Sequence, residues 1–339
     1  MTVPNSDRHV LVVGGAGYIG SVLTRMLLDR GCRVRVLDAL LYDNLSALDA
    51  VEGRAGFSFV HGDLCRAADV DIAMRGVTDV VLLAALVGDP VCRRHPDLAR
   101  RINETGTLEF INRLPDRQLD RFLLMSTCSN YGLRESDAEA TEASPLSPQS
   151  LYAETKVGVE RYLLDHSREY DFCMTILRAA TVYGISPRMR FDLTVNEFTR
   201  ELVLKRQLVV YDADTWRPYC HIEDIAGALT LVLEADRGVV DDQVFNVGAN
   251  GENYTKRMIV DLLCSHIPDA KVRYQAGSVD PRNYRVSFRK IAKCLNFSPE
   301  FTIAACLPHL IRAIRDGLYD DAESRPRFYR NASPAAPLS

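Results

Sequence analysis

The sequence predicts an α/β fold built on a doubly wound parallel sheet. Short apolar runs, typical of buried strands, alternate with segments of helical periodicity at the spacing of β-α-β units. The first of these strands is followed by evenly spaced glycines, and the second ends on an acidic residue. Because ligands of such sheets bind at the carboxyl ends of the strands, functional residues are expected directly after each strand.

The first strand is followed by a glycine-rich turn and a helix. An apolar run over Val10–Val13 precedes the turn, and helical periodicity extends over Ser21–Arg30. Gly14 allows a tight turn, Gly17 lets the backbone approach a pyrophosphate, and Gly20 lets the helix pack close to the strand. Free N–H groups at the start of the helix then face the anion. This arrangement is typical of Rossmann-type dinucleotide-binding domains.

The second strand ends on a carboxylate. This strand, Arg33–Leu37, is followed by Asp38, 18 residues after Gly20. A carboxylate at this distance can accept both hydrogen bonds from the adenosine ribose diol, and it repels a 2′-phosphate. We therefore predict NAD rather than NADP as the cofactor. Arg33 and Arg35 leave the alternative open, because they could reach a phosphate if they turned toward the ribose.

The third and fourth strands bring acidic and small residues to the same edge of the sheet. Phe57–Val60 leads into Asp63, which either faces the adenine or caps the helix that follows. Asp79–Leu83 opens into Ala84 and Ala85, whose small side chains would let the cofactor lie flat over the strand ends. The sequence does not separate the two interpretations of Asp63.

The fifth strand and the helix after it carry a threonine, a tyrosine and a lysine. The strand is Phe122–Ser126, and Tyr152 and Lys156 lie four residues apart in the next helical segment, so both side chains share one face. An ammonium beside a phenol favours the phenolate and lowers the pKa of the tyrosine. A base that takes a proton from an alcohol near neutral pH needs such a shift. A hydroxyl from Thr127, at the end of the strand, could contact the same substrate oxygen.

Composition narrows the class of protein. The 339 residues are 47% hydrophobic and 25% charged, as in a globular protein of one large or two closely joined domains. The formal net charge of −4, without long runs of either sign, disfavours nucleic acid and anionic membranes as partners. No apolar run approaches the roughly 18 residues of a membrane span and the first residues lack a signal peptide's apolar core, so a cytoplasmic protein is expected. Nine cysteines without a CxxC pair argue against a disulfide framework and against structural zinc, and no metal site is predicted.

A series of motifs extends over most of the chain. They are GGAGYIG at 14–20, Asp38, GDL at 62–64, LAA at 83–85, NETGT at 103–107, STCSNYG at 126–132, YAETK at 152–156, LRAATVYG at 177–184 and RPYCHIEDI at 217–225. In this order and spacing, over roughly residues 9–300, the chain resembles the extended short-chain dehydrogenase/reductase family. The resemblance is to its branch of NAD-dependent nucleotide-sugar epimerases and dehydratases, which contains the UDP-glucose 4-epimerase-like enzymes.

The resemblance implies a catalytic trio of Thr127, Tyr152 and Lys156. In such enzymes the tyrosine takes a proton from a hydroxyl of a nucleotide-diphosphate sugar while hydride passes to the nicotinamide of NAD, and the lysine also holds the nicotinamide ribose. The predicted cofactor contacts are Gly14, Gly17, Tyr18, Ile19, Gly20, Asp38, Asp63, Leu64, Ala84, Ala85, Tyr152 and Lys156. The predicted substrate contacts are Cys128, Ser129, Thr181, Asn196, Arg217 and Arg282. Arg188 and Arg190 fall in a predicted loop and receive no role.

The resemblance also implies how the chain is divided. Residues 1–180 are expected to form an NAD-binding Rossmann domain to which residues 216–248 return. Residues 181–215 and 249–325 are expected to form a smaller C-terminal substrate-binding α/β domain. Residues 326–339 are predicted to be a disordered tail.

A homodimer is expected on the resemblance alone. The family commonly pairs through two helices, here at about 96–113 and 150–169, that form a four-helix interface. Pro96–Asn112 is helical by its periodicity and its proline start. Apolar side chains that could supply contacts, and that core packing explains equally well, are Leu151, Val157, Val159, Tyr162 and Leu163.

The residues after Thr127 bear on which reaction is catalysed. A 4,6-dehydratase of the family carries Asp-Glu there, as acid and base, where this chain has Cys128 and Ser129. Decarboxylases usually place Glu at the second of these positions. A 3,5-epimerising relative has its cysteine acid at the position of Ser129 rather than of Cys128. Cys128 is therefore interpreted as a packing or substrate-facing thiol.

The chemistry that needs only the trio and NAD is epimerisation at C4 through a transient 4-keto sugar. The alternative is a nucleotide-sugar 4-dehydrogenase or 4-ketoreductase with exchangeable NAD(H). Epimerisation at C2 is a further possibility, and 4,6-dehydration and decarboxylation are less favoured. A non-catalytic NAD-binding protein is a hypothesis of another class, and the intact trio argues against it. The sequence identifies neither the nucleotide nor the sugar.

Overall fold

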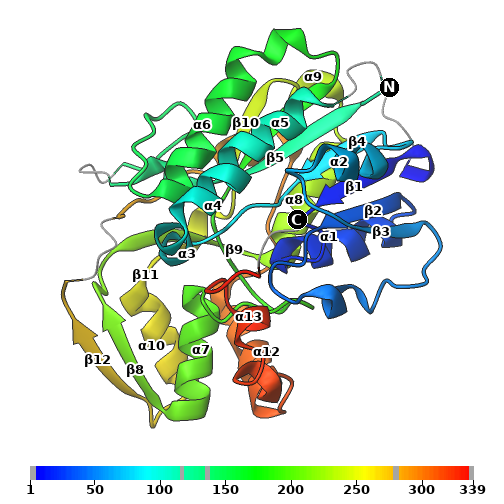
Figure 1. Cartoon of the computed structure of the whole chain (residues 1–339). Coiled ribbons are helices and arrows are strands. Elements are labelled where there is room, and N and C mark those ends of the chain that lie inside the picture. Colours follow the sequence, from blue (N-terminus) through cyan, green and yellow to red (C-terminus); the bar gives the residue numbers. More distant parts are fainter. Residues whose placement is uncertain (1–4, 115–117, 134–137, 278–281, 336–339) are drawn as a thin grey trace.

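The computed structural model describes residues 5–114, 118–133, 138–277 and 282–335. Its centre is a parallel sheet with the strand order β10-β6-β5-β4-β1-β2-β3 (Figure 1). These strands are β1 (His9–Val13), β2 (Arg33–Asp38), β3 (Phe57–His61), β4 (Asp79–Leu82), β5 (Arg121–Thr127), β6 (Cys173–Ala179) and β10 (Gln243–Val247). The chain adds β2 and β3 on one side of β1 and the later strands on the other, so the sheet is doubly wound and the predicted fold class is confirmed.

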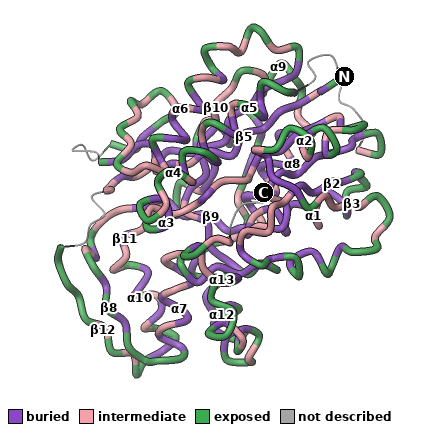
Figure 2. Tube along the Cα trace, viewed as in Figure 1, coloured by how far each residue is buried: buried purple, intermediate pink, exposed green. Residues whose placement is uncertain are grey.

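Helices cover both faces of this sheet, because successive side chains of a strand point to opposite faces. The helices of this part are α1 (Tyr18–Asp29), α2 (Ala67–Ala73), α3 (Asp89–Arg94), α4 (Pro96–Arg100), α5 (Thr107–Asn112), α6 (Leu151–Asp165), α8 (Ile222–Glu234) and α9 (Arg237–Val240). Val10 and Val12 pack into a core with side chains of α1 and α8, whereas Leu11 and Val13 pack into a second core with side chains of α5 and α6. Figure 2 shows the buried residues concentrated in these strands and on the inner faces of the helices.

The remaining elements form a smaller part of the molecule (Figure 1). They are β7 (Thr181–Tyr183), α7 (Thr194–Lys205), β8 (Gln207–Tyr211), β9 (Trp216–His221), β11 (Asn253–Thr255), α10 (Lys256–His266), β12 (Lys271–Gln275), α11 (Arg289–Leu295), α12 (Ile303–Arg315) and α13 (Pro326–Tyr329). Strands β11, β9 and β7 form one small sheet, and β12 pairs in parallel with β8. Between β9 and β11 the chain returns to the large part, where α8 packs on α1 and β10 joins the sheet beside β6.

The prediction of a disordered tail over 326–339 is wrong for residues 326–335. Phe328 and Tyr329 are buried, and the Tyr329 ring lies 5.8 Å from the ring of Phe191. Arg327 forms an ion pair with Asp43 at 2.9 Å. The two aromatic side chains bury enough apolar surface to order the segment, although the residues around them are polar or small. Residues 336–339 lie outside the described residues.

The apolar side chains of α6 that were considered for a dimer interface pack within the chain. Val157, Val159 and Leu163 are buried, and Leu151 and Tyr162 are partly buried against the core. Core packing therefore accounts for them, and they carry no argument for a dimer.

Two general features bear on the class of protein. All nine cysteines are free thiols. None of the helices in the described ranges combines the length and the apolar character that a bilayer-spanning segment requires.

Candidate active site

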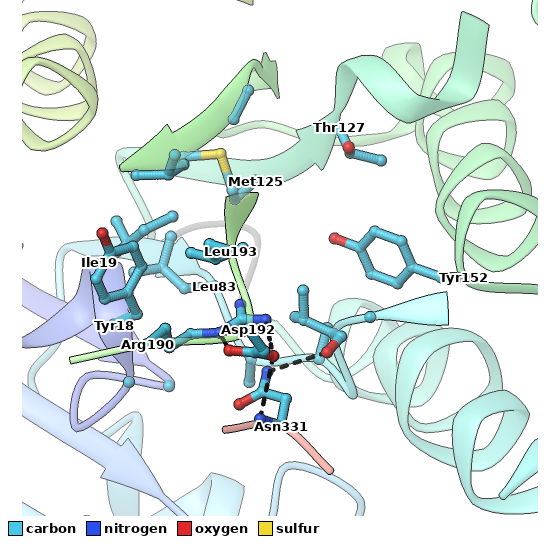
Figure 3. A pocket seen from close by; sticks show the side chains of 18 of the residues that line it. Tyr18, Ile19, Leu83, Met125, Thr127, Tyr152, Arg190, Asp192, Leu193 and Asn331 are labelled. Atoms are coloured by element: carbon cyan, nitrogen blue, oxygen red, sulfur yellow. Dashed lines mark hydrogen bonds and ion pairs between the residues drawn. The ribbon is translucent and has the colours of Figure 1, made fainter. Parts of the chain in front are cut away.

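A cavity of about 560 Å³ lies between the large sheet and the smaller part of the chain. It lies at the carboxyl ends of β1, β2, β4 and β5, where doubly wound sheets bind ligands. Every predicted cofactor residue lines it: Gly14, Gly17, Tyr18, Ile19, Gly20, Asp38, Asp63, Leu64, Ala84, Ala85, Tyr152 and Lys156. It is also lined by Thr127, Ser129, Thr181, Arg217 and Arg282. Figure 3 shows side chains from both parts of the molecule around this cavity.

The glycine turn between β1 and α1 forms one wall of the cavity. Gly14 has a φ of +87°, and a Cβ there would lie 2.8 Å from the backbone nitrogen of Ala84. A Cβ at Gly20 would overlap the Gly14 carbonyl oxygen, so the helix packs directly on the turn. Gly17 is the N-cap of α1 and supplies no side-chain cap, which leaves the N–H groups of the first turn for a ligand. The diphosphate of a dinucleotide fits this wall.

Asp38, at the end of β2, is held in place by the backbone around it. Its two carboxylate oxygens accept hydrogen bonds from the Ala16 N–H at 3.0 Å and from the Leu40 N–H at 2.9 Å. Burial raises the pKa of Asp38, and these two bonds oppose the rise. Each carboxylate oxygen has a further lone pair, so the side chain can still accept bonds from a ribose diol.

The two arginines that left NADP open do not line the cavity. Arg35 donates to Ser58 Oγ at 3.3 Å and to the backbone carbonyls of Ala73 and Arg75 at 2.9 and 2.7 Å. Arg33 is exposed. Neither is placed to bind a 2′-phosphate beside Asp38, which agrees with the prediction of NAD.

Asp63 does not cap the helix after it. α2 begins at Ala67 with Arg66 as its N-cap. Asp63 Oδ1 instead accepts a hydrogen bond from the Cys65 N–H at 2.9 Å, and the residue lines the cavity. The capping interpretation of Asp63 is therefore wrong, and a contact with the adenine stays a prediction.

A π-helical turn over Arg101–Gly106 joins α4 and α5 and fixes the loop after β4. The buried Asn103 side chain accepts a hydrogen bond from the Leu86 N–H at 2.7 Å and donates one to the Leu86 carbonyl at 3.0 Å. Both halves of the amide are used, so the loop that carries Ala84 and Ala85 is held at the cavity wall. Asn103 belongs to the NETGT motif, but sequence reasoning gave it no role.

Tyr152, Lys156 and Thr127 come together where β5 meets α6. The phenol oxygen of Tyr152 points into the cavity, on the side where Thr127 lies (Figure 3). Thr127 Oγ1 accepts a hydrogen bond from the Ser129 N–H at 3.1 Å, which leaves its hydroxyl proton for a substrate oxygen. One helical turn further on, the buried Lys156 ammonium donates to the Met125 carbonyl at 3.0 Å. The geometry therefore presents a phenol and a hydroxyl to one region of the cavity, with a lysine behind them.

The predicted lowering of the Tyr152 pKa is wrong for the protein without ligands. Burial raises the pKa of Tyr152, because the phenolate would lose water, although the charges of Arg190 and Arg282 oppose the rise. Burial also lowers the pKa of Lys156 to about 8. Ionisation of Tyr152 therefore needs more positive charge in the cavity, such as an oxidised nicotinamide ring brings.

The lowered pKa of Lys156 predicts how stability changes with pH. In the unfolded chain lysine keeps its proton up to about pH 10.5, while in the folded protein Lys156 loses it near pH 8. Between these values the unfolded state binds more protons, so the free energy of unfolding rises with pH. We expect the stability of wild type relative to Lys156→Met, both freed of NAD, to increase by about 2–3 kcal/mol between pH 7 and pH 10 in urea unfolding.

The control for this prediction is Lys205→Met. Lys205 is exposed and pairs with Glu201 at 2.8 Å. The difference in free energy of unfolding between wild type and Lys205→Met should therefore hardly change with pH. A difference between wild type and Lys156→Met that stays constant from pH 7 to pH 10 would contradict the shifted pKa.

Two arginines of the smaller part line the cavity in agreement with their predicted place. Arg282 donates to Ser129 Oγ at 3.2 Å and forms an ion pair with Asp89 at 2.8 Å. Arg217 donates to the Arg282 backbone carbonyl, and its guanidinium carbon lies 5.2 Å from the centroid of the Tyr284 ring. Arg282 thus ties the smaller part to the start of α3 across the cavity.

Cys128 and Asn196 do not line the cavity, so their prediction as substrate contacts is wrong. Of the two interpretations of Cys128, the structure supports the packing thiol. Cys128 is 1% exposed, its thiol donates to the Arg178 carbonyl at 3.2 Å, and burial raises its pKa well above the usual value. It packs as an inert thiol. The buried Asn196 amide donates to the Tyr18 hydroxyl at 3.0 Å and accepts from the Gly184 N–H at 3.1 Å, so it holds protein segments together rather than a ligand.

Sequence reasoning missed a polar group that the loop before α7 and the tail bring into the cavity. Arg188, Arg190 and Asp192 come from the loop, and Asn331 comes from the tail. Asp192 accepts two bonds from Arg190, at 3.0 and 2.7 Å, and one from the Asn331 N–H at 3.2 Å. Asn331 also donates to the Val87 carbonyl at 3.0 Å, so the tail bridges the smaller part and the loop after β4 (Figure 3). In the tail sequence, the adjacent Phe328 and Tyr329 were the signal that this segment packs against the rest of the chain.

Comparison with known proteins gives consistent matches along the chain. The sequence model of the NAD dependent epimerase/dehydratase family matches residues 10–248. The chain is 33% identical over 320 residues to the low-salt glycan biosynthesis protein Agl12 of Haloferax volcanii, a match that covers 89% of this chain and 98% of that protein. It is 28% identical over 313 residues to the UDP-glucose 4-epimerase of Corynebacterium glutamicum, a match that covers 86% of this chain and 91% of that protein.

A solved structure with a different reaction is similar to the same degree. The dTDP-glucose 4,6-dehydratase DesIV from Streptomyces venezuelae, crystallised with NAD bound, matches with a TM-score of 0.81 and 28% identity, covering 91% of this chain and 97% of that one. Since an epimerase and a dehydratase have the same identity to the chain, the choice of reaction has to come from the residues of the cavity.

Proposed function

The chain belongs to the NAD dependent epimerase/dehydratase family, and we propose that within it the protein epimerises a nucleotide-diphosphate sugar at C4 through a transient 4-keto sugar. As a member of this family it is an NAD-dependent enzyme. The glycine turn, with its uncapped helix start, and Asp38 fit that cofactor.

The observation that carries the proposal is the surroundings of the two residues after Thr127. In the family, 4,6-dehydration uses an acid and a base at these positions. Cys128 is turned away from the cavity onto the Arg178 carbonyl. Ser129 Oγ lies 3.2 Å from Arg282 and 3.4 Å from the Tyr284 hydroxyl and has no acidic proton to give. The pair thus lacks the groups that eliminate water, and the cavity supports chemistry on a single hydroxyl.

The proposed mechanism assigns one task to each member of the trio. NAD, when bound, supplies the acceptor and the donor of the hydride. Tyr152 takes the proton of the C4 hydroxyl, keeps it while the sugar is a ketone, and returns it to the oxygen after the sugar has turned. Thr127 donates a hydrogen bond to the same oxygen and steadies it in both states. Lys156 favours the phenolate of Tyr152 and holds the nicotinamide ribose.

The ordered tail favours an epimerase over the alternative dehydrogenase or ketoreductase. The Ala335 N–H donates to the Leu41 carbonyl at 2.7 Å, and Arg94 donates to the Ala332 carbonyl at 2.6 Å. Leu41, Arg94 and Ala332 all line the cavity. A net redox enzyme has to exchange its cofactor in every turnover, whereas an epimerase works with a cofactor that stays enclosed.

A nucleotide sugar deuterated at C4 tests the proposal. We expect conversion, without added NAD, to an isomer of the same mass that keeps its deuterium, because the hydride returns to the carbon that it left. Mass spectrometry and NMR of the product, over a panel of UDP-, dTDP- and GDP-linked hexoses and pentoses, measure both properties. Loss of water from the product would instead identify a dehydratase. Turnover that requires added NAD and leaves deuterium in free NADH would identify the redox alternative.

A homodimer through α4, α5 and α6 is also part of the proposal, on the basis of family membership. Leu164, near the end of α6, is an apolar side chain that is 36% exposed. Light scattering of the purified protein measures the oligomeric state.

A further inference from the structure

Arg188, in the loop before α7, is a buried cation whose donors are largely unused. It lines the cavity and is 2% exposed. Its Nε and Nη2 atoms are shielded from solvent and make no hydrogen bond with any described residue. The nearby carboxylate of Asp192 is taken by Arg190 at 2.7 Å. A buried guanidinium whose Nε and Nη2 have no hydrogen-bond acceptor is costly, so its presence points to an anion that accepts these bonds when a ligand binds.

The neighbours of Arg188 place it in the adenosine part of the cofactor site. Its guanidinium carbon lies 4.7 Å from the centroid of the Tyr42 ring, in the loop after β2. Its positive charge acts to lower the pKa of Asp38, the residue that fits the adenosine ribose. Asp38 in turn accepts the hydrogen bond of Ala16 in the glycine turn. Arg188 therefore shares one region of the cavity with the wall that fits a diphosphate.

We propose that Arg188 binds the diphosphate of NAD from the smaller part of the chain, while the first-turn N–H groups of α1 bind it from the large sheet. The planar fork of a guanidinium matches two phosphate oxygens, and the diphosphate is directly attached to the ribose that Asp38 fits. A 2′-phosphate is disfavoured at this place, because Asp38 repels it. The inference rests on NAD as the cofactor and is independent of the C4 reaction.

If the Arg188 donors are satisfied only when a ligand is bound, replacing Arg188 has opposite effects on stability and on NAD affinity. Arg188→Met removes an unpaired buried charge, so the NAD-free protein should unfold at the same temperature as wild type or at a higher one. The same change removes a charge-assisted contact to the cofactor, so NAD should bind less tightly. If Arg188 instead had a structural role, its replacement would lower the unfolding temperature.

The test compares ligands that differ in their phosphates. Full-length wild type and Arg188→Met, freed of NAD with charcoal, are titrated by calorimetry with NAD, ADP-ribose, adenosine and UDP. We expect NAD and ADP-ribose to bind about 10–100-fold more weakly to the variant, and adenosine and UDP to change by less than about 2-fold. Arg188→Lys, which keeps the charge and loses the fork, should be intermediate. Arg113→Met, which removes an exposed guanidinium paired with Asp71, should change nothing.

Three outcomes would overturn the proposal. Equal weakening of adenosine and ADP-ribose would place Arg188 on the nucleoside. Weakening of UDP alone would assign it to the diphosphate of the sugar nucleotide. A lower unfolding temperature of the NAD-free variant with unchanged NAD affinity would make it a structural residue. If Arg188→Met does not fold, Arg188→Lys supplies the affinities that decide between these outcomes.

Discussion

Replacement of Tyr152 by phenylalanine is expected to lower kcat by about 10²–10⁴-fold, the usual contribution of a positioned base. The phenol oxygen points into the cavity, and no hydrogen bond ties it to any described residue, so its loss removes the base and little else (Figure 3). The affinities for NAD and for the nucleotide sugar should stay within a few-fold of wild type. Steady-state turnover and the NAD content of the purified protein measure the two effects separately.

Tyr162→Phe is the matched control, since it makes the same chemical change on the same helix. Its hydroxyl donates to Asn112 Oδ1 at 2.6 Å, outside the cavity. This variant should keep the turnover of wild type. A Tyr152→Phe protein with the kcat of wild type would rule out the assignment of the base, and one that had also lost its NAD would show that the phenol holds the cofactor.

The parts of the site that follow directly from strand ends could be predicted from the sequence. Gly14 and Asp38 each come one residue after an apolar run, and parallel strands bring those ends to one edge. Tyr152 and Lys156 follow from helical spacing, which fixes their common face. In these cases the local pattern itself determines where a side chain points.

The rest depends on contacts that no local pattern contains. Cys128 follows Thr127 in a 3-10 turn over Cys128–Tyr131, and its thiol contacts the Arg178 carbonyl of β6 although both neighbours line the cavity. Arg188 and Asn331 are polar side chains in a predicted loop and a predicted tail, and only the fold of the smaller part brings them inside. The raised pKa of Tyr152 has the same origin, because burial by distant segments outweighs the opposing charges of Arg190 and Arg282.

Behind the catalytic trio, Arg178 and Glu160 form a buried ion pair, and removal of one partner alone is expected to cost much stability. Glu160 accepts two hydrogen bonds from Arg178 Nε and Nη2, at 3.0 and 2.6 Å, and the two side chains are 5% and 1% exposed. It also accepts bonds from Asn130, at 2.8 Å, and from Ser126. Glu160→Gln keeps the shape and leaves the guanidinium buried without a counter-charge, so we expect a loss of about 3–5 kcal/mol in the free energy of unfolding, measured in urea.

The double variant Glu160→Gln/Arg178→Met separates the pair from the rest of the network. It removes both charges, so it should recover part of the stability that Glu160→Gln alone has lost, and equal or greater destabilisation would contradict a dominant role of the unpaired charge. The pair also reaches the catalytic residues, because Glu160 lies one turn from Lys156 and raises its pKa against the effect of burial. In Glu160→Gln the pKa of Lys156 should therefore fall further. The free energy of unfolding of the protein with Lys156, relative to the same protein with Lys156→Met, should then begin to rise at a lower pH in the Glu160→Gln background than in wild type.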